Sequence, residues 1–243
     1  MTTPAAATTN IEDPSEKIIV ALDVSTADEA RDIIAELSGK VGAYKIGLQL
    51  FVSAGPEFVR EVAAENKVFL DLKFHDIPNT VANAAVEAAK LGVWMTNVHA
   101  IGGLDMMRST VEAVDRQCEE QGIERPLLIA VTVLTSSDAN VLNETGIESS
   151  VDEQVMRLAK LTKAAGFDGV VASAREAAII RQEIGEDFVI VTPGIRAKDA
   201  TNDDQRRVMT FSDAMKNGST YAVIGRPITG QADRVAAVSA IIG

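Results

Sequence analysis

The segment Asp71-Leu72-Lys73-Phe74-His75-Asp76 places three charged side chains and a histidine close together in the chain. Side chains alternate between the two faces of a strand, so we expect Asp71 and Lys73 to share one face and Leu72 to take the other. An unpaired buried charge is unfavourable, so both charges should pair with each other and with further charged groups. A lysine held in this way can stabilise developing negative charge and donate a proton. A purely structural ion pair is the alternative interpretation.

Polar residues also stand at the ends of other predicted strands. Lys45, on the preceding predicted strand, is the natural next member of a charge network with Asp71 and Lys73. This second lysine and the further carboxylate of Asp76 favour a catalytic site over an isolated structural pair. The other polar side chains near strand ends are those of Asp23, Asn97, His99, Thr132, Thr135, Arg196 and Arg226.

These side chains must be positioned by a regular alternation of strands and helices. Short β-branched runs alternate with longer helical stretches. Eight strands are predicted, at residues 17–24, 43–48, 68–74, 94–100, 127–134, 169–172, 188–192 and 221–225. Eight such units predict an α/β fold, a single-domain (β/α)8 TIM barrel over residues 17–243. A doubly wound sheet is the alternative, but the first predicted strand lacks the glycine-rich fingerprint that follows it in that fold.

Helix boundaries are indicated by local signals. Thr26-x-x-Glu29 predicts a capping box at the start of a helix, and Gly39 predicts its end. Ser173-x-x-Glu176 predicts a second capping box directly after the sixth strand. Apolar spacing also predicts helices over residues 111–120, 151–162 and 235–242.

Composition and charge exclude several classes of protein. The formal net charge of −12 disfavours binding to nucleic acid or to an anionic membrane surface. Residues 1–16 lack the pattern of a signal peptide and are predicted to form a disordered N-terminal extension. With one cysteine, Cys118, and two histidines, the chain has no basis for a disulfide or a Cys/His zinc site. We therefore expect a cytoplasmic protein without a nucleic-acid or membrane partner.

The last two predicted strands end in residues that suit an anion. Gly194 and Gly225 allow close approach of the backbone to a ligand, and Arg226 can bind a phosphate through two hydrogen bonds. Barrels often bind phosphate at the loops after strands seven and eight. The sequence therefore predicts a phosphate group on the substrate.

Residues 71–80, Asp-Leu-Lys-Phe-His-Asp-Ile-Pro-Asn-Thr, resemble the signature of the orotidine 5′-monophosphate decarboxylase family. The resemblance covers almost the whole predicted barrel. Further matching segments follow in the order of the family: Leu22-Asp23, Tyr44-Lys45-Ile46-Gly47, Val98-His99-Ala100, Val133-Leu134-Thr135-Ser136, Thr192-Pro193-Gly194-Ile195-Arg196, Asp204-Gln205-Arg206-Arg207 and Val223-Ile224-Gly225-Arg226.

The resemblance implies a carboxy-lyase that converts orotidine 5′-monophosphate to UMP and CO₂, the last step of de novo UMP synthesis, with neither metal nor organic cofactor. It implies that Lys73 donates a proton to C6 of the pyrimidine. It also implies a homodimer with shared active sites, in which Asp76 and Thr80 serve the partner's site. The implied network is Lys45, Asp71, Lys73 and Asp76; the implied substrate contacts are Asp23 and Lys45 at the ribose, Asp71 near the carboxylate, Thr135 at the pyrimidine, and Arg196, Gln205, Gly225 and Arg226 at the phosphate.

Two other functions remain as alternatives. Sugar-phosphate decarboxylases similar to 3-keto-L-gulonate 6-phosphate decarboxylase share an Asp-x-Lys-x-x-Asp core and use magnesium, but the Phe74-His75 context argues against them. A non-catalytic phosphate-binding barrel would need only the Gly194 and Arg226 region. Since Lys73 can already donate the proton, His75 and His99 are expected to play structural roles.

Overall fold

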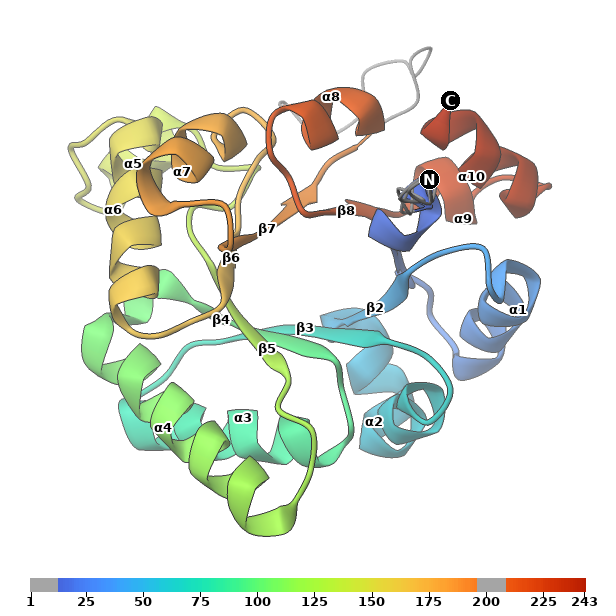
Figure 1. Ribbon diagram of the computed structural model, residues 1–243, viewed down its shortest axis with the longest axis horizontal. Helices are drawn as coiled ribbons and strands as arrows, with labels where there is room; N and C mark the ends of the chain where they lie inside the picture. Colours follow the sequence, from blue (N-terminus) through green and yellow to red (C-terminus); the bar gives the residue numbers. More distant parts are fainter. Residues whose placement is uncertain (1–12, 196–208) are drawn as a thin grey trace, which may run out of the picture.

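The computed structural model describes residues 13–195 and 209–243, and it confirms the predicted barrel. Eight parallel strands close into a ring in chain order, with β1 paired to both β2 and β8. Looking into the ring, the helices surround the strands (Figure 1). The strands are β1 (Ile18–Ala21), β2 (Ala43–Gly47), β3 (Val68–Phe74), β4 (Met95–His99), β5 (Leu127–Val131), β6 (Gly169–Val171), β7 (Val189–Pro193) and β8 (Tyr221–Ile224).

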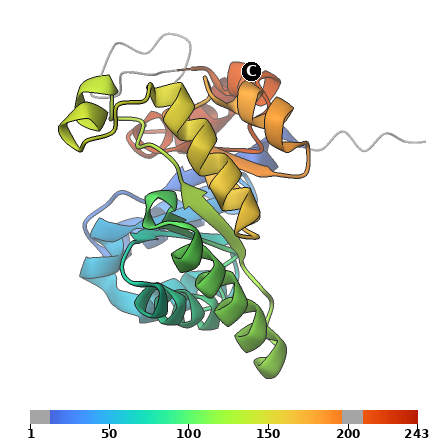
Figure 2. The same cartoon turned by 90° about the vertical axis from the view of Figure 1, so that its left-hand side faces the viewer.

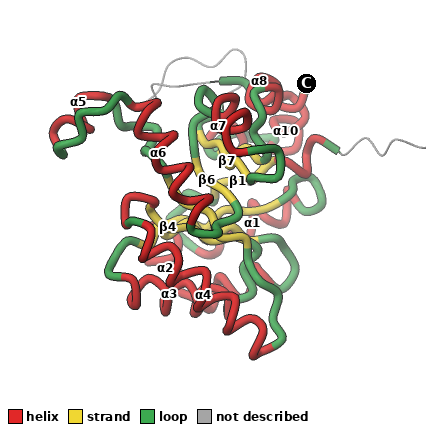
Figure 3. Tube along the Cα trace, turned by 60° about the vertical axis from the view of Figure 1, so that its left-hand side comes forward, coloured by secondary structure: helices red, strands yellow, loops and turns green. Residues whose placement is uncertain are grey.

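Most helices cover the outside of the barrel, and α5 lies apart from this layer at one end of the molecule (Figures 2 and 3). Helix α2 is interrupted at Gly55, which has a φ of +76° and is followed by Pro56. The helices are η1 (Pro14–Lys17), α1 (Ala27–Leu37), α2 (Leu48–Ala63), α3 (Pro78–Lys90), η2 (Ala100–Gly102), α4 (Leu104–Gln121), α5 (Ala139–Glu144), α6 (Val151–Ala164), α7 (Ala177–Ile184), α8 (Phe211–Lys216), α9 (Arg226–Thr229) and α10 (Arg234–Ile242).

The predicted boundaries of the folded region and of several strands need adjustment. Residues 14–16, which we expected in the extension, belong to η1, where the Asp13 side chain accepts a hydrogen bond from the Ser15 backbone N–H. Strand β3 has the predicted bounds, whereas β5 ends at Val131 rather than at residue 134. Beyond Val131 the chain turns into the loop over the barrel mouth, where Leu134 is exposed.

One of the two predicted helix caps is wrong. The Thr26 side chain accepts a hydrogen bond from the Glu29 N–H as predicted, although the Glu29 carboxylate reaches the N–H of Ser25 rather than that of Thr26. Ser173 does not cap α7, because its hydroxyl accepts from the Arg175 N–H in a turn that precedes the helix. A complete capping box instead begins α6, between Ser150 and Glu153.

Strand alternation divides the core into an inner and an outer layer. Inward side chains fill the barrel, and outward side chains pack beneath the helices. The inner layer consists of Ile19, Ala21, Ala43, Phe69, Met95, Ile129, Val191 and Val223. Because Phe69 points inward, Asp71 two residues later also points inward, toward the mouth of the barrel.

Within the described ranges, no helix has the length and apolar character needed to cross a membrane.

Arg181 fastens the loops at the end of the barrel opposite the carboxyl ends of the strands. Its guanidinium, with only 12% of the side chain exposed, donates to backbone carbonyls before β7 and before β8. The acceptors are the carbonyls of Gly185, Glu186, Phe188 and Gly218 and the hydroxyl of Thr220.

We expect Arg181→Ala to lower the free energy of unfolding by about 3 kcal/mol, because several partly buried carbonyls lose their donor at once. The melting temperature should fall by roughly 6–12 °C for a domain of this size. Thermal denaturation followed by circular dichroism measures the change. Arg60→Ala is the control, because Arg60 pairs with Glu57 on the exposed face of α2 and its loss should barely move the melting temperature. Equal effects of the two substitutions would contradict the role of Arg181.

Candidate active site

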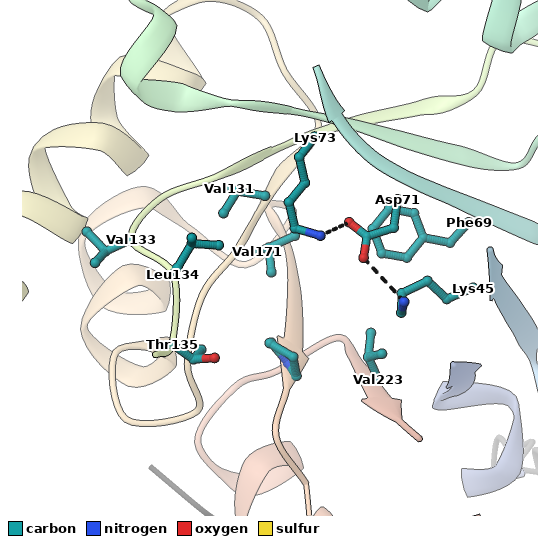
Figure 4. A pocket seen from close by; sticks show the side chains of 11 residues that line it. Lys45, Phe69, Asp71, Lys73, Val131, Val133, Leu134, Thr135, Val171 and Val223 are labelled. Atoms are coloured by element: carbon teal, nitrogen blue, oxygen red, sulfur yellow. Dashed lines mark hydrogen bonds and ion pairs between the residues drawn. The ribbon is translucent and has the colours of Figure 1, made fainter. Parts of the chain in front are cut away.

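A cavity of about 190 Å³ opens at the carboxyl ends of the strands (Figure 4). This is the end at which barrel enzymes carry their active sites. The cavity has a charged side and a predominantly apolar side. Its lining residues are Lys45, Phe69, Asp71, Lys73, Val131, Val133, Leu134, Thr135, Val171, Pro193 and Val223.

Four charged side chains of alternating sign form a row along the charged side. Lys45 Nζ lies 3.0 Å from Asp23 Oδ1 and 3.4 Å from Asp71 Oδ2. Lys73 Nζ lies 2.7 Å from Asp71 Oδ1, so the Asp71 carboxylate stands between two ammonium groups (Figure 4). The side chains of Lys45 and Asp71 are each 11% exposed, which strengthens their interaction relative to a surface pair. The predicted pairing of Lys45, Asp71 and Lys73 is therefore confirmed.

The register of the first three strands brings this row together. Lys45 stands opposite Ala21 of β1 and Phe69 of β3, and Gly47 stands opposite Asp71. A Cβ atom at Gly47 would lie 3.0 Å from Lys45 Nζ, so the absence of a side chain leaves room for the ammonium group. Charged residues from β2 and β3 thus meet Asp23, which follows β1, at one level of the barrel.

Lys73 reaches Asp71 by a different route from the one predicted. Regular alternation would end β3 with an extended Lys73, but its φ is +53°, the only positive φ of a non-glycine among the described residues. The register between β3 and β4 shifts between Leu70 and Phe74. Residues with side chains seldom adopt this left-handed conformation, and it is found disproportionately at functional sites. A bulge, rather than simple alternation, aims the lysine into the cavity.

Asn97 on β4 belongs to this cluster, although we did not assign it a role from the sequence. Its Oδ1 accepts a hydrogen bond from the Lys73 backbone N–H at 2.8 Å, and its Nδ2 donates to Asp71 Oδ1 at 2.7 Å. The side chain is completely buried. The sequence feature that could have revealed this role is its position two residues after Met95, which places Asn97 on the inward face at the level of Asp71.

The opposite side of the cavity is mainly apolar. Val131, Val133, Leu134, Pro193 and Val171 line this side and give it an apolar surface. Low local polarity strengthens the electrostatic interaction between Lys73 and any charge that develops next to it. Thr135 lies on the loop after β5 and also lines the cavity (Figure 4).

Only part of the predicted phosphate region falls within the described residues. Gly194 has a φ of +84°, and Gly225 precedes α9, which begins at Arg226. A Cβ at Gly225 would lie 3.7 Å from the Asp23 carboxylate, so this strand end adjoins the charged row. Arg196 and Gln205 lie outside the described residues.

The two residues assigned to the partner's site lie away from the interior of this barrel. Asp76 is exposed in the loop after β3, where its carboxylate accepts a hydrogen bond from the Ile77 N–H at 2.6 Å. Thr80 is exposed in the first turn of α3. The charged row of a single chain is therefore Asp23, Lys45, Asp71 and Lys73.

The histidines flank the cluster. The His75 and His99 rings lie 5.8 Å apart. The pKa of His99 is lowered, first by burial and then by electrostatic interaction with His75 and Lys73. The lowered pKa favours the neutral form of His99 at pH 7. The structural roles expected of both histidines stay predictions.

The single cysteine does not line the cavity. Cys118 is buried on α4, and burial raises the pKa of its thiol. In the part of the chain that the structure describes, no group of three or more His, Cys, Asp or Glu side chains is placed to hold a metal ion.

The model of the orotidine 5′-phosphate decarboxylase / HUMPS family matches residues 16–241 of the chain. The chain belongs to this family. Its relatives include the orotidine 5′-phosphate decarboxylase of Pelobacter propionicus, 52% identical over 96% of both chains. The enzyme of that name from Legionella pneumophila is 52% identical over 93% of this chain and 97% of its own.

Solved structures support the same family assignment. The crystal structure of orotidine 5′-phosphate decarboxylase from Lactobacillus acidophilus aligns with a TM-score of 0.81 at 40% identity, over 92% of this chain and 96% of its own. A conserved protein from Geobacillus kaustophilus aligns with a TM-score of 0.79 at 38% identity, over 91% of this chain and 96% of its own. The family assignment and the (β/α)8 fold predicted from the sequence are thus confirmed.

The left-handed backbone of Lys73 generates a prediction about stability. Lys73→Gly and Lys73→Ala both remove the ammonium group, but only glycine adopts a positive φ without strain. We expect the Gly variant to be more stable than the Ala variant by about 1 kcal/mol, measured by urea denaturation. At an ordinary strand position glycine is the less stable residue, so that order would show that the backbone is not left-handed here.

Proposed function

We propose that this chain converts orotidine 5′-monophosphate to UMP and CO₂ in the cytoplasm, as the last step of de novo UMP synthesis, without metal or organic cofactor. The observation that carries the proposal is the Lys73 ammonium group, held against Asp71 at the charged side of the mouth cavity. Membership of the decarboxylase family supports the choice of substrate.

The chemistry requires a fixed cation. When the bond between C6 and the carboxylate breaks, CO₂ departs and its bonding electron pair stays on C6. Lys73 is preorganised to stabilise this charge, because the hydrogen bond to Asp71 holds its ammonium group in place. Lys73 then transfers a proton from Nζ to C6, which completes UMP, and the neutral amine regains a proton from water.

Asp71 has two possible contributions to this step. It orients Lys73, and its carboxylate also stands where the carboxylate of the substrate would approach, so the repulsion between them would be relieved as CO₂ leaves. The largest enzymatic accelerations correspond to roughly 20 kcal/mol or more of barrier lowering, which exceeds what one contact supplies. Binding of the remote ribose and phosphate therefore has to help position the ring.

The arrangement around the cavity supports the substrate contacts that we propose. Asp23 and Lys45 are assigned to the ribose, and Thr135, across the cavity, to the pyrimidine. Phosphate is assigned to the end of β8 at Gly225 and Arg226, with Arg196 and Gln205 from the segment between β7 and α8. The closeness of Gly225 to Asp23 supports this order, because the phosphate and the ribose are bonded to each other in the proposed substrate.

Lys73→Ala should lower kcat for decarboxylation by at least about 10³-fold, because both the proton donor and the stabilising charge are removed. The loss of absorbance as orotidine 5′-monophosphate is consumed measures the rate, and calorimetry measures the affinity for UMP, which should persist. Lys160→Ala is the control, since Lys160 is an exposed lysine on α6 paired with Glu183. Decarboxylation that survives Lys73→Ala would refute the assigned role.

Loss of wild-type activity on treatment with a chelator would favour a magnesium-dependent mechanism instead.

We also propose a homodimer with shared active sites. Four exposed apolar side chains follow three neighbouring strands at the barrel mouth: Leu48 and Val52 after β2, Ile77 after β3 and Ile101 after β4. Exposed apolar residues at one end of a barrel favour a protein interface there. Asp76 and Thr80 are exposed close to Ile77 in the chain, which supports their proposed role in the partner's site.

Mixing Lys73→Ala with Asp76→Ala subunits should restore activity. A mixed dimer combines Lys73 of one chain with Asp76 of the other at one of its two sites, so an equal mixture should recover about a quarter of wild-type activity. A mixture of Lys73→Ala and Asp71→Ala is the control, because both residues serve the site of their own chain and no site is restored. No recovery in the first mixture would place Asp76 in its own chain's site.

A further inference from the structure

The contact between β3 and β4 is irregular next to Lys73. Leu70 pairs with Thr96, and the next pair is Phe74 with Val98. Residues 71–73 of β3 thus stand against a single residue of β4, Asn97. Extra residues in a bulge lose their regular backbone partners, so other groups have to satisfy them.

The Asn97 side chain fills this gap with both ends of its amide. Oδ1 accepts from the Lys73 N–H at 2.8 Å, in place of a ladder carbonyl. Nδ2 donates to Asp71 Oδ1 at 2.7 Å, the same oxygen that accepts from Lys73 Nζ. One buried amide is therefore bonded to the backbone of the lysine and to the carboxylate that holds its ammonium group.

These contacts bear directly on the strained conformation of Lys73. A non-glycine residue with φ of +53° persists only where its surroundings hold it in place. The Lys73 N–H donates to Asn97 Oδ1, which holds the backbone of Lys73. Asn97 Nδ2 donates to Asp71 Oδ1, which holds the carboxylate that binds the Lys73 ammonium group. Asn97 does not line the cavity, so its influence on a substrate passes through these two residues.

We propose that Asn97 is a positioning residue, which holds the bulge of β3 so that the Lys73 ammonium group lies at the reacting carbon. This inference rests on the proposed function of Lys73. An amide suits the position because it combines an acceptor for the N–H with a donor for the carboxylate; a carboxylate there would oppose the charge of Asp71, and an alkyl side chain would satisfy neither group.

A merely structural role for Asn97 would resemble that of its neighbour Thr96. Both side chains are completely buried on β4, and the Thr96 hydroxyl donates to the Leu70 carbonyl at 3.2 Å. Thr96 touches neither Asp71 nor Lys73 through this bond. Thr96→Val is therefore a matched control, which removes one buried hydrogen bond from the same strand and leaves the charged row intact.

The test compares Asn97→Ala, Asn97→Asp and Thr96→Val with the wild-type protein. We expect both Asn97 variants to lower kcat on the order of 100-fold, as small displacements of a reacting group do, while the Kd for UMP changes less than about threefold. Thr96→Val should keep kcat within about twofold. Asn97→Asp, almost identical in size, decides the outcome if Asn97→Ala does not fold. An Asn97 variant with the kcat of Thr96→Val would overturn the proposal, as would a parallel loss of UMP binding.

A second measurement is independent of catalysis. Hydrogen exchange of the Lys73 amide, followed by NMR, should be slow in the wild-type protein and faster in Asn97→Ala, but unchanged in Thr96→Val. An unchanged rate in Asn97→Ala would contradict the bond on which the inference depends. If the wild-type protein itself failed to decarboxylate orotidine 5′-monophosphate, the proposed function would fall, whereas equal activity of the wild-type protein and the Asn97 variants would remove only the inference.

Discussion

The site depends on holding two ammonium groups at one buried carboxylate. One carboxylate oxygen of Asp71 pairs with Lys73 and the other with Lys45. Lys45 also pairs with the more exposed carboxylate of Asp23. Charges removed from water are tolerated only when their partners are close and well oriented. The strand register, the missing side chain at Gly47 and the amide of Asn97 all serve this requirement. The two ammonium groups repel each other and would separate in a more flexible scaffold. The closed barrel therefore holds them at the distances that the charged row requires.

The sequence predicted much of the fold because its signals are local and repeated. All eight strands could be located, since alternating β-branched runs and amphipathic helices leave a periodic pattern. Errors arose where a residue had two possible hydrogen-bond partners. Ser173 has the spacing of a helix cap, yet its hydroxyl serves a turn, whereas Ser150 caps α6. Such choices depend on the path of the chain after the strand, which short-range spacing does not contain.

For the site, charge and alternation were sufficient to group Lys45, Asp71 and Lys73, but not to describe how they are held. The left-handed backbone of Lys73 arises from a mismatch between β3 and β4, strands that are defined by residues far apart in the chain. The sequence showed Asn97 as a polar residue near the end of a strand, but its contacts depend on the register shift between β3 and β4. Contacts across strands are thus the part of the site that a single sequence predicts least well.

The ring closure between β1 and β8 has a consequence for synthesis of the protein. β8 pairs with β1 near the opposite end of the chain, and Gly225 comes to lie against Asp23 through that pairing. The residues of the charged row lie in the first third of the chain, between β1 and the end of β3, so the ribosome synthesises them early. The residues of β8 are synthesised almost last. The proposed phosphate site at the end of β8 can therefore form only after nearly the whole barrel has been synthesised, long after the residues of the charged row.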